Sequence, residues 1–384
     1  MAGVRYVVLG GGAQGSACAF DLARGGDAEE VVLADRDVAH PRPFLLPLIG
    51  DGIELRSVDA KDVRQVASAM ERADVVACAL PYYFNVDMAR LAIEAGAHFC
   101  DLGGNTELVD EQRKLTDSAV AAGVSVVPDC GLAPGMVNIL AQGGIDSMDR
   151  TESVRIFVGG LPQHPKPPLN YQIVYSMEGV LDYYTTPVLV LENGEVVEKE
   201  ALTGVEPVDF PRPVGRLEAF FTAGGISRMP YRFQGEIASM SYKTLRYPGH
   251  AQLMKAIRDL GLVDREPVQV GGCAVSPREL FIEVVSPRLG NPEGDDLVAM
   301  RVEVSGTRGG DPASVTYEMI DYFDAEHGLT AMMRTTGYSL AAVARLQASG
   351  AVRAGVHTAS EAVPAEAYVR SLADRGVEIA RRER

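Results

Sequence analysis

Short apolar segments rich in β-branched residues alternate with longer segments of helical period over the first third of the chain. This alternation is typical of βαβ units around a parallel sheet. Strands in such a sheet are covered on both faces, which fits their nearly continuous apolar character. Six strands are predicted: YVVLG from Tyr6, VVLAD to Asp35, IELRSVD to Asp59, DVVACAL to Leu80, HFCDLG to Gly103 and VSVVPDCG to Gly131.

The connection between the second and third predicted strands departs from this pattern. The segment VAHPRPFLLPLIG carries Pro41, Pro43 and Pro47. Proline inside a helix removes a hydrogen-bond donor and clashes with the preceding turn. We therefore expect a loop with at most one helical turn in this segment.

After residue 132 the pattern changes to longer strands with hairpin signals. Asn193-Gly194 interrupts PVLVLENGEVVEKE and predicts a two-residue hairpin turn. DLVAMRVEVSGTR and ASVTYEMIDYFD flank Gly309-Gly310-Asp311-Pro312 and are expected to pair antiparallel. We expect a first domain over residues 1–132, completed by 335–384, and a second domain over 133–334.

Length, charge and cysteine content narrow the function classes. A chain of 384 residues exceeds what one core usually organises, and a net charge of −16 argues against nucleic acid or anionic membranes as partners. No apolar run is long enough to span a bilayer and no secretory leader is visible, so a cytoplasmic location is expected. The five cysteines are odd in number and widely spaced, which favours reduced thiols over disulfides or a metal site.

The strongest chemical motif follows the first predicted strand. Gly10 permits a tight turn, Gly12 lets backbone amides approach a pyrophosphate, and Gly15 lets the next helix pack closely on the strand. Ala13 and Gln14 complete the loop at the start of that helix. An acidic residue, Asp35, ends the next strand about 20 residues later, as the dinucleotide fingerprint requires.

The fingerprint also bears on the choice of cofactor. The Asp35 carboxylate can accept hydrogen bonds from the adenosine ribose and would repel a 2′-phosphate, so NAD is favoured over NADP. Arg36 can offset that repulsion or stack on adenine, and Asp35 can alternatively be a solvated strand-end acid. Asp59 is placed to contact adenine or its ribose, or else to cap the next helix. From topology alone, Ala79, Leu80 and Pro81 are expected beside the nicotinamide ribose.

Several segments resemble the saccharopine dehydrogenase superfamily and look most like its bacterial L-lysine 6-dehydrogenases. They are DLGGN from Asp101, PDCGLAPGMVNILA from Pro128, VGGLP from Val158, MEGVLDYYT from Met177, EAFFTAGG from Glu218, YKTLRYPGHAQ from Tyr242 and RTTGYSLAAVA from Arg334. The resemblance implies a Rossmann domain, a mixed α/β domain for substrate binding and dimerisation, and nicotinamide-dependent oxidation at an amine carbon. It also implies a homodimer or a larger homo-oligomer.

Within that resemblance the substrate is expected to be L-lysine, because Ala133-Pro134-Gly135 stands where saccharopine reductases carry DPG. The implied reaction oxidises the ε-amine to 2-aminoadipate 6-semialdehyde, which cyclises to 1-piperideine-6-carboxylate, with release of ammonia and NADH. Two alternatives stay open. One is a saccharopine or carboxynorspermidine type of dehydrogenase or reductase, and the other is a catalytically silent NAD-binding regulator.

An alkylammonium ion has a pKa of about 10.4 and must lose a proton before its carbon can donate hydride. In SMSYKTLRYPGHAQ, the cations Lys243 and Arg246 are expected to hold the substrate carboxylate, and His250 to shuttle a proton. The alternative is a solvated basic strand edge with a capping histidine. Asp101 ends the fifth strand and is expected to serve as a base or as a partner for the substrate ammonium, ahead of Asp129, although it can instead form a turn before Gly103-Gly104.

The remaining candidates come from segments at the carboxyl ends of the predicted strands or from the resemblance. Tyr83, beside Tyr82 and Asn85, is expected to wall the nicotinamide or the lysine methylenes, with core packing as the alternative. The resemblance suggests Thr222 for substrate binding. It also suggests cofactor contacts for Gly103, Asn105, Gly135 and Asn138, the last two of which would equally suit capping and a hinge.

Overall fold

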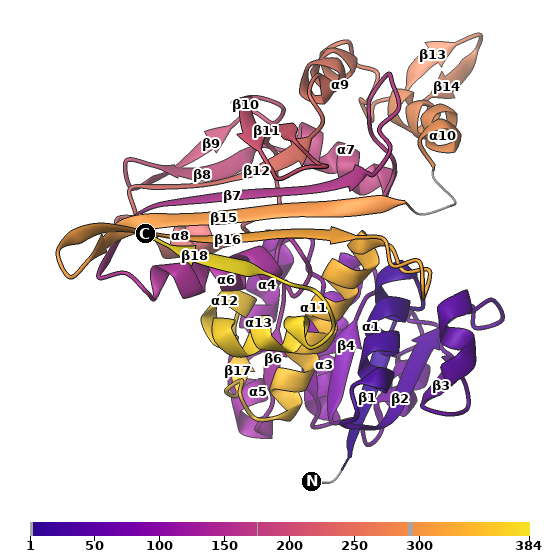
Figure 1. Cartoon of the computed structure of the whole chain (residues 1–384). Coiled ribbons are helices and arrows are strands. Elements are labelled where there is room, and N and C mark those ends of the chain that lie inside the picture. The colour runs from indigo at the N-terminus through magenta and orange to yellow at the C-terminus, as the bar shows by residue number, and fades with distance from the viewer. Residues whose placement is uncertain (1–2, 175, 291–294) are drawn as a thin grey trace.

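Two sheets dominate the computed structural model of the chain, which describes residues 3–174, 176–290 and 295–384 (Figure 1). The first is a seven-stranded parallel sheet in the order β17-β6-β5-β4-β1-β2-β3. Its strands are β1 (Val4–Leu9), β2 (Ala28–Asp35), β3 (Ile53–Ser57), β4 (Val75–Cys78), β5 (His98–Asp101), β6 (Ser125–Val127) and β17 (Gly355–Val356). All six predicted strands are present, and the order is that of a Rossmann domain. The α/β fold class is confirmed.

Helices connect these strands on both faces of the sheet. They are α1 (Ala13–Arg24), α2 (Val63–Met70), α3 (Asn85–Glu94), α4 (Thr106–Arg113) and α5 (Thr116–Ala122), with a short 3₁₀ turn η2 (Tyr82–Phe84) before α3. The proline-rich connection forms the 3₁₀ helix η1 (Pro43–Leu48), so the expectation of at most one turn was too short. Pro43 stands in its first turn, where a missing N–H costs no helical hydrogen bond.

The second sheet has nine strands and mixed direction. They are β7 (Arg150–Pro162), β8 (Val188–Glu192), β9 (Glu195–Lys199), β10 (Glu206–Asp209), β11 (Arg216–Phe221), β12 (Ser239–Arg246), β15 (Asp296–Arg308), β16 (Asp311–Tyr322) and β18 (Ala380–Glu383). Only β12 and β7 pair in parallel among the recorded pairs of this sheet. Its associated helices are α6 (Met136–Ile145), α7 (Met177–Thr185), α8 (Met229–Arg232), α9 (His250–Asp259) and α10 (Pro277–Leu289).

Both predicted hairpins are confirmed. Strands β8 and β9 pair around Asn193-Gly194, whose φ angles of 52° and 81° are the left-handed values that a two-residue type I′ turn requires. Strands β15 and β16 pair antiparallel along their length, up to Arg308 opposite Asp311. A further hairpin of β13 (Val268–Val270) and β14 (Cys273–Val275) projects from the second domain next to α10 (Figure 1).

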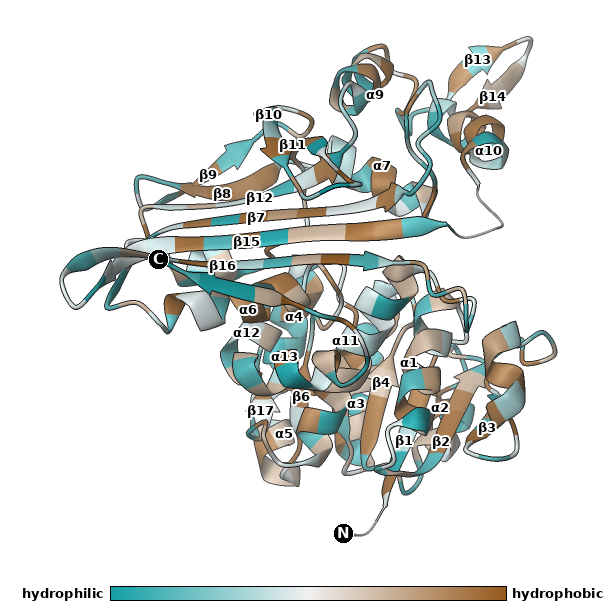
Figure 2. Cartoon of the chain, viewed as in Figure 1, coloured by the Kyte–Doolittle hydropathy of each residue, from teal (hydrophilic) through white to brown (hydrophobic). Residues whose placement is uncertain are grey.

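The last part of the chain joins the two sheets. Helix α11 (Ala331–Ala348) packs against β4 and β5 of the first sheet and against β15 of the second. After it, β17 pairs with β6, the helices α12 (Ala359–Ala362) and α13 (Ala365–Ala373) follow, and β18 pairs with β16. One apolar cluster runs through both domains, including Val8, Tyr338 and Val302. In Figure 2 the strands β2 and β4 are hydrophobic along most of their length, as doubly covered strands should be.

Among the described residues, no helix has both the length and the apolar character needed to cross a lipid bilayer.

Candidate active site

The glycine loop between β1 and α1 has the geometry of a pyrophosphate cradle. A Cβ atom at Gly15 would lie 1.8 Å from the carbonyl oxygen of Gly10, so only glycine allows this close packing. Gly10 has φ of 99° and packs against the Ala79 carbonyl. A Cβ at Gly12 would meet no atom within 4 Å apart from those of its neighbours in the chain. The loop therefore has an open face at the N-terminus of α1, where an anion is favoured.

Asp35 is tied directly to this loop. Its Oδ2 accepts a hydrogen bond from the Gly11 N–H at 2.6 Å and its Oδ1 accepts one from the Asp37 N–H at 2.9 Å. Arg36 next to it is exposed, and Ala79, Leu80 and Pro81 follow β4 at the same carboxyl edge of the sheet. The carboxylate thus lies beside the glycine loop, the relationship on which the fingerprint depends.

The alternative that Asp59 caps a helix is wrong. Helix α2 is capped by Asp62, whose carboxylate accepts hydrogen bonds from the Arg64 and Gln65 N–H groups. Asp59 instead accepts one from the Lys61 N–H at 2.9 Å and is exposed after β3.

A cavity of about 250 Å³ opens between the Rossmann sheet and the second sheet, and we call it the inner chamber. The first domain supplies Gln14 and the backbone around Gly103, Gly104 and Gly131. The second domain supplies side chains from β12, together with Tyr183 of α7, and α11 adds Met332 and Thr336. The chamber therefore lies at the carboxyl edge of the parallel sheet, the usual ligand position in this fold.

Strand alternation decides which residues of β12 face the inner chamber. Tyr242, Thr244 and Arg246 line it. Lys243 points to the opposite face, where its Nζ donates to the Gly204 carbonyl and to Glu206 Oε1, both at 2.6 Å. The predicted cluster of Lys243, Arg246 and His250 is thus divided, because successive side chains of a strand point to opposite faces. It is also buried and not a solvated strand edge.

Arg246 places a buried positive charge at one end of the inner chamber. Its side chain is 3% exposed, its Nη1 donates to the carbonyls of Leu245 and Gly160, and its guanidinium lies 4.8 Å from the centre of the Tyr171 ring. A buried guanidinium that lines a cavity is suited to bind a carboxylate.

His250, at the first position of α9, does not line the inner chamber. Its Nδ1 bonds the Leu169 carbonyl at 3.1 Å, which requires a proton on Nδ1, so Nε2 accepts from the Tyr184 hydroxyl at 3.0 Å. Burial and the charge of Arg246 lower the pKa of His250 to about 3. The ring is therefore neutral near pH 7 and holds its neighbours in place, which does not fit the expected proton shuttle.

Two buried carboxyl groups lie beneath the floor of the inner chamber. Asp101 accepts hydrogen bonds from the Gly103 N–H and from Gln112 Nε2, both at 2.7 Å. Asp129 Oδ1 is packed so closely on Gly103 that a Cβ there would lie 1.9 Å from it. Burial raises the pKa of Asp101 to about 6, and burial together with the charge of Asp101 raises the pKa of Asp129 to about 7.

A larger outer chamber of about 780 Å³ continues from the inner one and shares Gly104, Tyr183 and Tyr242 with it. It carries four carboxylates, those of Glu107, Asp110, Asp182 and Glu198, and the guanidinium of Arg228. Thr222 lines it and shares a hydrogen bond of 2.7 Å with Thr244 of the inner chamber. Tyr82 also lines it, whereas Tyr83 is 62% exposed and lines neither chamber.

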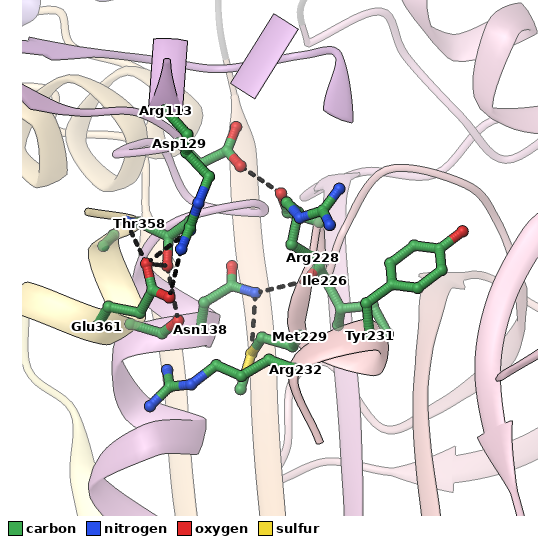
Figure 3. A pocket seen from close by; sticks show the side chains of 13 residues that line it. Arg113, Asp129, Asn138, Ile226, Arg228, Met229, Tyr231, Arg232, Thr358 and Glu361 are labelled. Atoms are coloured by element: carbon green, nitrogen blue, oxygen red, sulfur yellow. Dashed lines mark hydrogen bonds and ion pairs between the residues drawn. The ribbon is translucent and has the colours of Figure 1, made fainter. Parts of the chain in front are cut away.

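The segment before α8 connects the two domains beside a third, polar cavity of about 240 Å³ (Figure 3). The Ser227 hydroxyl donates to Asp129, and Arg228 Nη1 pairs with Asp110 Oδ2 at 2.5 Å. Asn138 accepts from the Gly135 N–H at 2.7 Å and donates to the Ile226 carbonyl at 3.2 Å. Gly135 and Asn138 therefore cap α6, and Asn138 also holds α6 against the segment before α8. Asn105 likewise caps α4 while lining the outer chamber.

Sequence reasoning did not single out Tyr183, Tyr242 or Ser227, and it ranked Asp129 below Asp101. The period-two pattern of β12 contains the signal for Tyr242, because it shares a face with Arg246. No local signal marks Ser227, whose partner lies 98 residues away. Among the described residues, no cluster of three or more His, Cys, Asp or Glu side chains is arranged to hold a metal ion.

The fold and the site together define a protein of the class that binds a nicotinamide dinucleotide on a Rossmann domain and closes a substrate chamber with a second domain. Two family models match the chain: the saccharopine dehydrogenase NADP binding domain over residues 6–127 and the saccharopine dehydrogenase C-terminal domain over residues 131–377. The chain belongs to the saccharopine dehydrogenase family, which confirms the resemblance at the level of the superfamily.

Relatives and solved structures agree with this assignment. The chain is 28% identical to the mouse mitochondrial alpha-aminoadipic semialdehyde synthase over 68% of its own length and 31% of the relative's. It is 24% identical to a saccharopine dehydrogenase (NADP⁺, L-glutamate-forming) of Saccharomyces cerevisiae, over 73% and 63%. The chain thus spans about a third of the mouse relative.

Among solved structures, the apo saccharopine dehydrogenase of Saccharomyces cerevisiae superposes with a TM-score of 0.81 at 19% identity, with both chains fully covered. The homospermidine synthase of Legionella pneumophila in complex with NAD superposes with a TM-score of 0.68 at 11% identity, covering 99% and 91%. These likenesses establish the shared fold.

Proposed function

We propose that this protein is an NAD-dependent dehydrogenase that oxidises the ε-amine of L-lysine and releases ammonia. The observation that carries the proposal is the polarity of the inner chamber. Buried Arg246 lies at one end, and the buried carboxyl groups of Asp101 and Asp129 lie under the floor near Gly103. A molecule with an anionic head and a cationic tail would be oriented by these opposite charges.

The geometry of the glycine loop and of Asp35 supports the binding of a dinucleotide. The open face of the Gly10–Gly15 loop and the N-terminus of α1 would hold the pyrophosphate. Asp35 would accept from the adenosine ribose and repel a 2′-phosphate, which favours NAD. When bound, the nicotinamide supplies a hydride acceptor for the amine carbon, whose resulting imine is hydrolysed to an aldehyde and ammonia.

The residues of the chamber would orient the substrate. Arg246 would bind the α-carboxylate through its planar fork of donors. Tyr183 and Tyr242 line the middle of the chamber, where their rings would contact the methylene chain. The amine would then lie over Gly103 and Gly104, where ionised Asp129 beneath the floor favours positive charge on nitrogen.

The outer chamber favours lysine over saccharopine. Saccharopine carries additional carboxylates, which would extend through the outer chamber. Asp110 there is paired with Arg228, and Asp182 with Arg265 and Arg278, which leaves the carboxylates of Glu107 and Glu198 as its negative charge. Like charges repel, so the cationic amine of lysine matches the charge of the outer chamber better than the carboxylates of saccharopine do.

Formation of NADH from NAD with L-lysine, ornithine, saccharopine and no amine, at alkaline pH, tests the proposal. Lysine is expected to give the highest kcat/KM. Preference for saccharopine would replace lysine as the substrate, and binding of NAD without turnover of any amine would indicate a regulator.

A further inference from the structure

The Asp129 carboxyl group is separated from the inner chamber by the backbone of the chamber floor. Gly103 and Gly104 line the chamber, and Asp129 packs against Gly103 from below. Asp129 is 4% exposed and lines the third, polar cavity, but it does not line the inner or the outer chamber. A proton that leaves a substrate amine in the chambers can therefore reach Asp129 only through another group.

Ser227 is in the position that such a group requires. Its hydroxyl donates a hydrogen bond to Asp129 Oδ2, and Ser227 lines both the outer chamber and the polar cavity. Figure 3 shows Asp129 at the edge of the polar cavity, with a dashed line for this hydrogen bond. A hydroxyl group can accept one proton while it donates another. Ser227 can therefore connect water in the outer chamber with the carboxyl group beneath the floor.

Both residues of this hydrogen bond have an uncommon backbone conformation. The φ angle is 61° at Asp129 and 47° at Ser227, in the left-handed region that residues other than glycine seldom adopt. Backbone strain of this kind persists where the surrounding structure holds a residue in place, and it is frequent at functional sites. Two such residues, 98 positions apart in the sequence, meet in one contact between the domains.

The polar cavity beside Asp129 is suited to hold water. Its volume of about 240 Å³ is enough for several water molecules, and its lining is rich in hydrogen-bonding groups. The charged residues that line it are Arg113 of α4, Asp129, Arg228, Arg232 of α8 and Glu361 of α12. Arg113 is paired with Glu361, and Arg228 is paired with Asp110. Water in this cavity would accept a proton from Asp129 and pass it to the solvent.

The other titratable groups near Asp129 lie toward the Rossmann sheet and the inner chamber. Asp101 is bonded to the Gly103 N–H and to Gln112, and its charge together with burial raises the pKa of Asp129 to about 7. Burial raises the pKa of Tyr183 to about 12 and raises the pKa of the Cys130 thiol well above its usual value. Tyr183 and Cys130 therefore keep their protons near pH 7, whereas Asp129 can take up a proton and release it.

Oxidation of an alkylammonium ion by a dinucleotide releases one proton. One N–H bond breaks and leaves its electron pair on nitrogen, and the neighbouring carbon then loses a hydride to the dinucleotide, which gives an iminium ion. Addition of water to the iminium ion yields an aldehyde and an ammonium ion without further net release of protons. One proton in each turnover must therefore pass from the chambers to the solvent.

We propose that Ser227 passes this proton from water in the outer chamber to Asp129, which releases it to water in the polar cavity. The Ser227 Oγ–H bond breaks toward Asp129 Oδ2 while Oγ forms a new O–H bond with the proton from the chamber water. Once Asp129 has released its proton into the polar cavity, rotation of the hydroxyl group restores the original hydrogen bond. The proposal rests on the proposed oxidation of an amine, but not on which amine is oxidised.

Steady-state kinetics of Ser227→Ala and Ser227→Asn test the proton path. Alanine removes the hydroxyl group, whereas asparagine tolerates the left-handed backbone and can still donate to Asp129 but cannot pass a proton. Both variants are expected to lower kcat by about 10- to 100-fold, with a smaller change in KM. Ser147→Ala is the matched control, because it removes another half-buried hydroxyl group, bonded to the Gly144 carbonyl. It should keep the kcat of the wild-type protein.

Rescue by a soluble proton carrier distinguishes a proton path from a structural role. Imidazole titrates near neutral pH. It should restore the kcat of Ser227→Ala several-fold as its concentration rises, and it should leave the wild-type protein and Ser147→Ala unchanged. Full activity of Ser227→Asn would overturn the proposal, and so would a loss of activity in Ser227→Ala that imidazole does not restore. A wild-type protein that oxidises no amine would instead overturn the proposed function, and the proton path with it.

Discussion

Lys243 and Arg246 point to opposite faces of β12, because an odd number of positions along a strand separates them. Arg246 lines the inner chamber, and Lys243 is bonded to Glu206 and Gly204 on the far face, with its Nζ 4.6 Å from the centre of the Phe221 ring. Two neighbouring cations therefore have separate tasks. One offers charge to a ligand, and the other stabilises the sheet.

This difference predicts contrasting variants. Arg246→Ala should lower kcat/KM for lysine by about 10- to 100-fold, chiefly through KM, because it removes a charge-assisted contact with the carboxylate. Lys243→Ala should leave KM within about twofold and lower the melting temperature by a few degrees. Steady-state kinetics and thermal unfolding of both variants check this. Equal losses of activity would contradict the assignment of the two faces.

The raised pKa of Asp129 predicts a pH dependence of activity. If ionised Asp129 supports positive charge on the substrate nitrogen, kcat/KM should rise with pH through the pKa of this group, about 7. In Asp129→Asn this rise of kcat/KM should be absent, and a second rise at more alkaline pH, which comes from deprotonation of the substrate ammonium, should remain. Asp101→Asn should move the limb to lower pH, because it removes the negative charge that contributes to the raised pKa of Asp129. A limb unchanged in both variants would exclude Asp129 as its source.

The same carboxyl group predicts a pH dependence of stability with the opposite sign. Its folded pKa of about 7 lies above the ordinary value near 3.8, so the folded state binds the proton more tightly than the unfolded state. The stabilisation is complete below pH of about 4 and is lost as pH rises through 7, up to about 4 kcal/mol for such a shift. Asp129→Asn should flatten the change in unfolding free energy across this range. Urea unfolding at several pH values measures it.

The Asp35 carboxylate contacts the glycine loop as well as the expected ribose position, so two substitutions there should differ. Asp35→Asn keeps an acceptor for the Gly11 N–H but removes the charge, and it should mainly raise the ratio of kcat/KM for NADP to that for NAD. Asp35→Ala removes both and should raise KM for either dinucleotide by about 10-fold or more. Binding of NAD and NADP by calorimetry, without substrate, separates the two effects. Identical binding constants for the two variants would mean that the hydrogen bond between Asp35 and the Gly11 N–H does not contribute to dinucleotide binding.

His250 should behave as a packing residue. Its ring lies among Tyr171, Tyr184 and Phe220, and it is neutral near pH 7. His250→Ala should cost about 2–4 kcal/mol of stability through the cavity it leaves. No limb of the pH profile near 6.5 should disappear. Loss of such a limb at unchanged stability would restore the proton shuttle expected from the sequence.

The fold and the cofactor loop could be predicted because their signals are local. The Gly10–Gly15 loop, the six apolar strands and the Asn193-Gly194 turn each depend on residues close together in the chain. The substrate site depends on contacts across the fold. Asp129 meets Ser227 and Asp110 meets Arg228 only after both domains have formed.

Helix α11 has a mechanical consequence. Because α11 is buried in the core that both domains share, the two domains cannot rotate apart as rigid bodies without exposing the buried residues of this helix. Admission of a ligand should therefore involve local displacement of residues at the chamber mouth and not a rotation of one domain against the other.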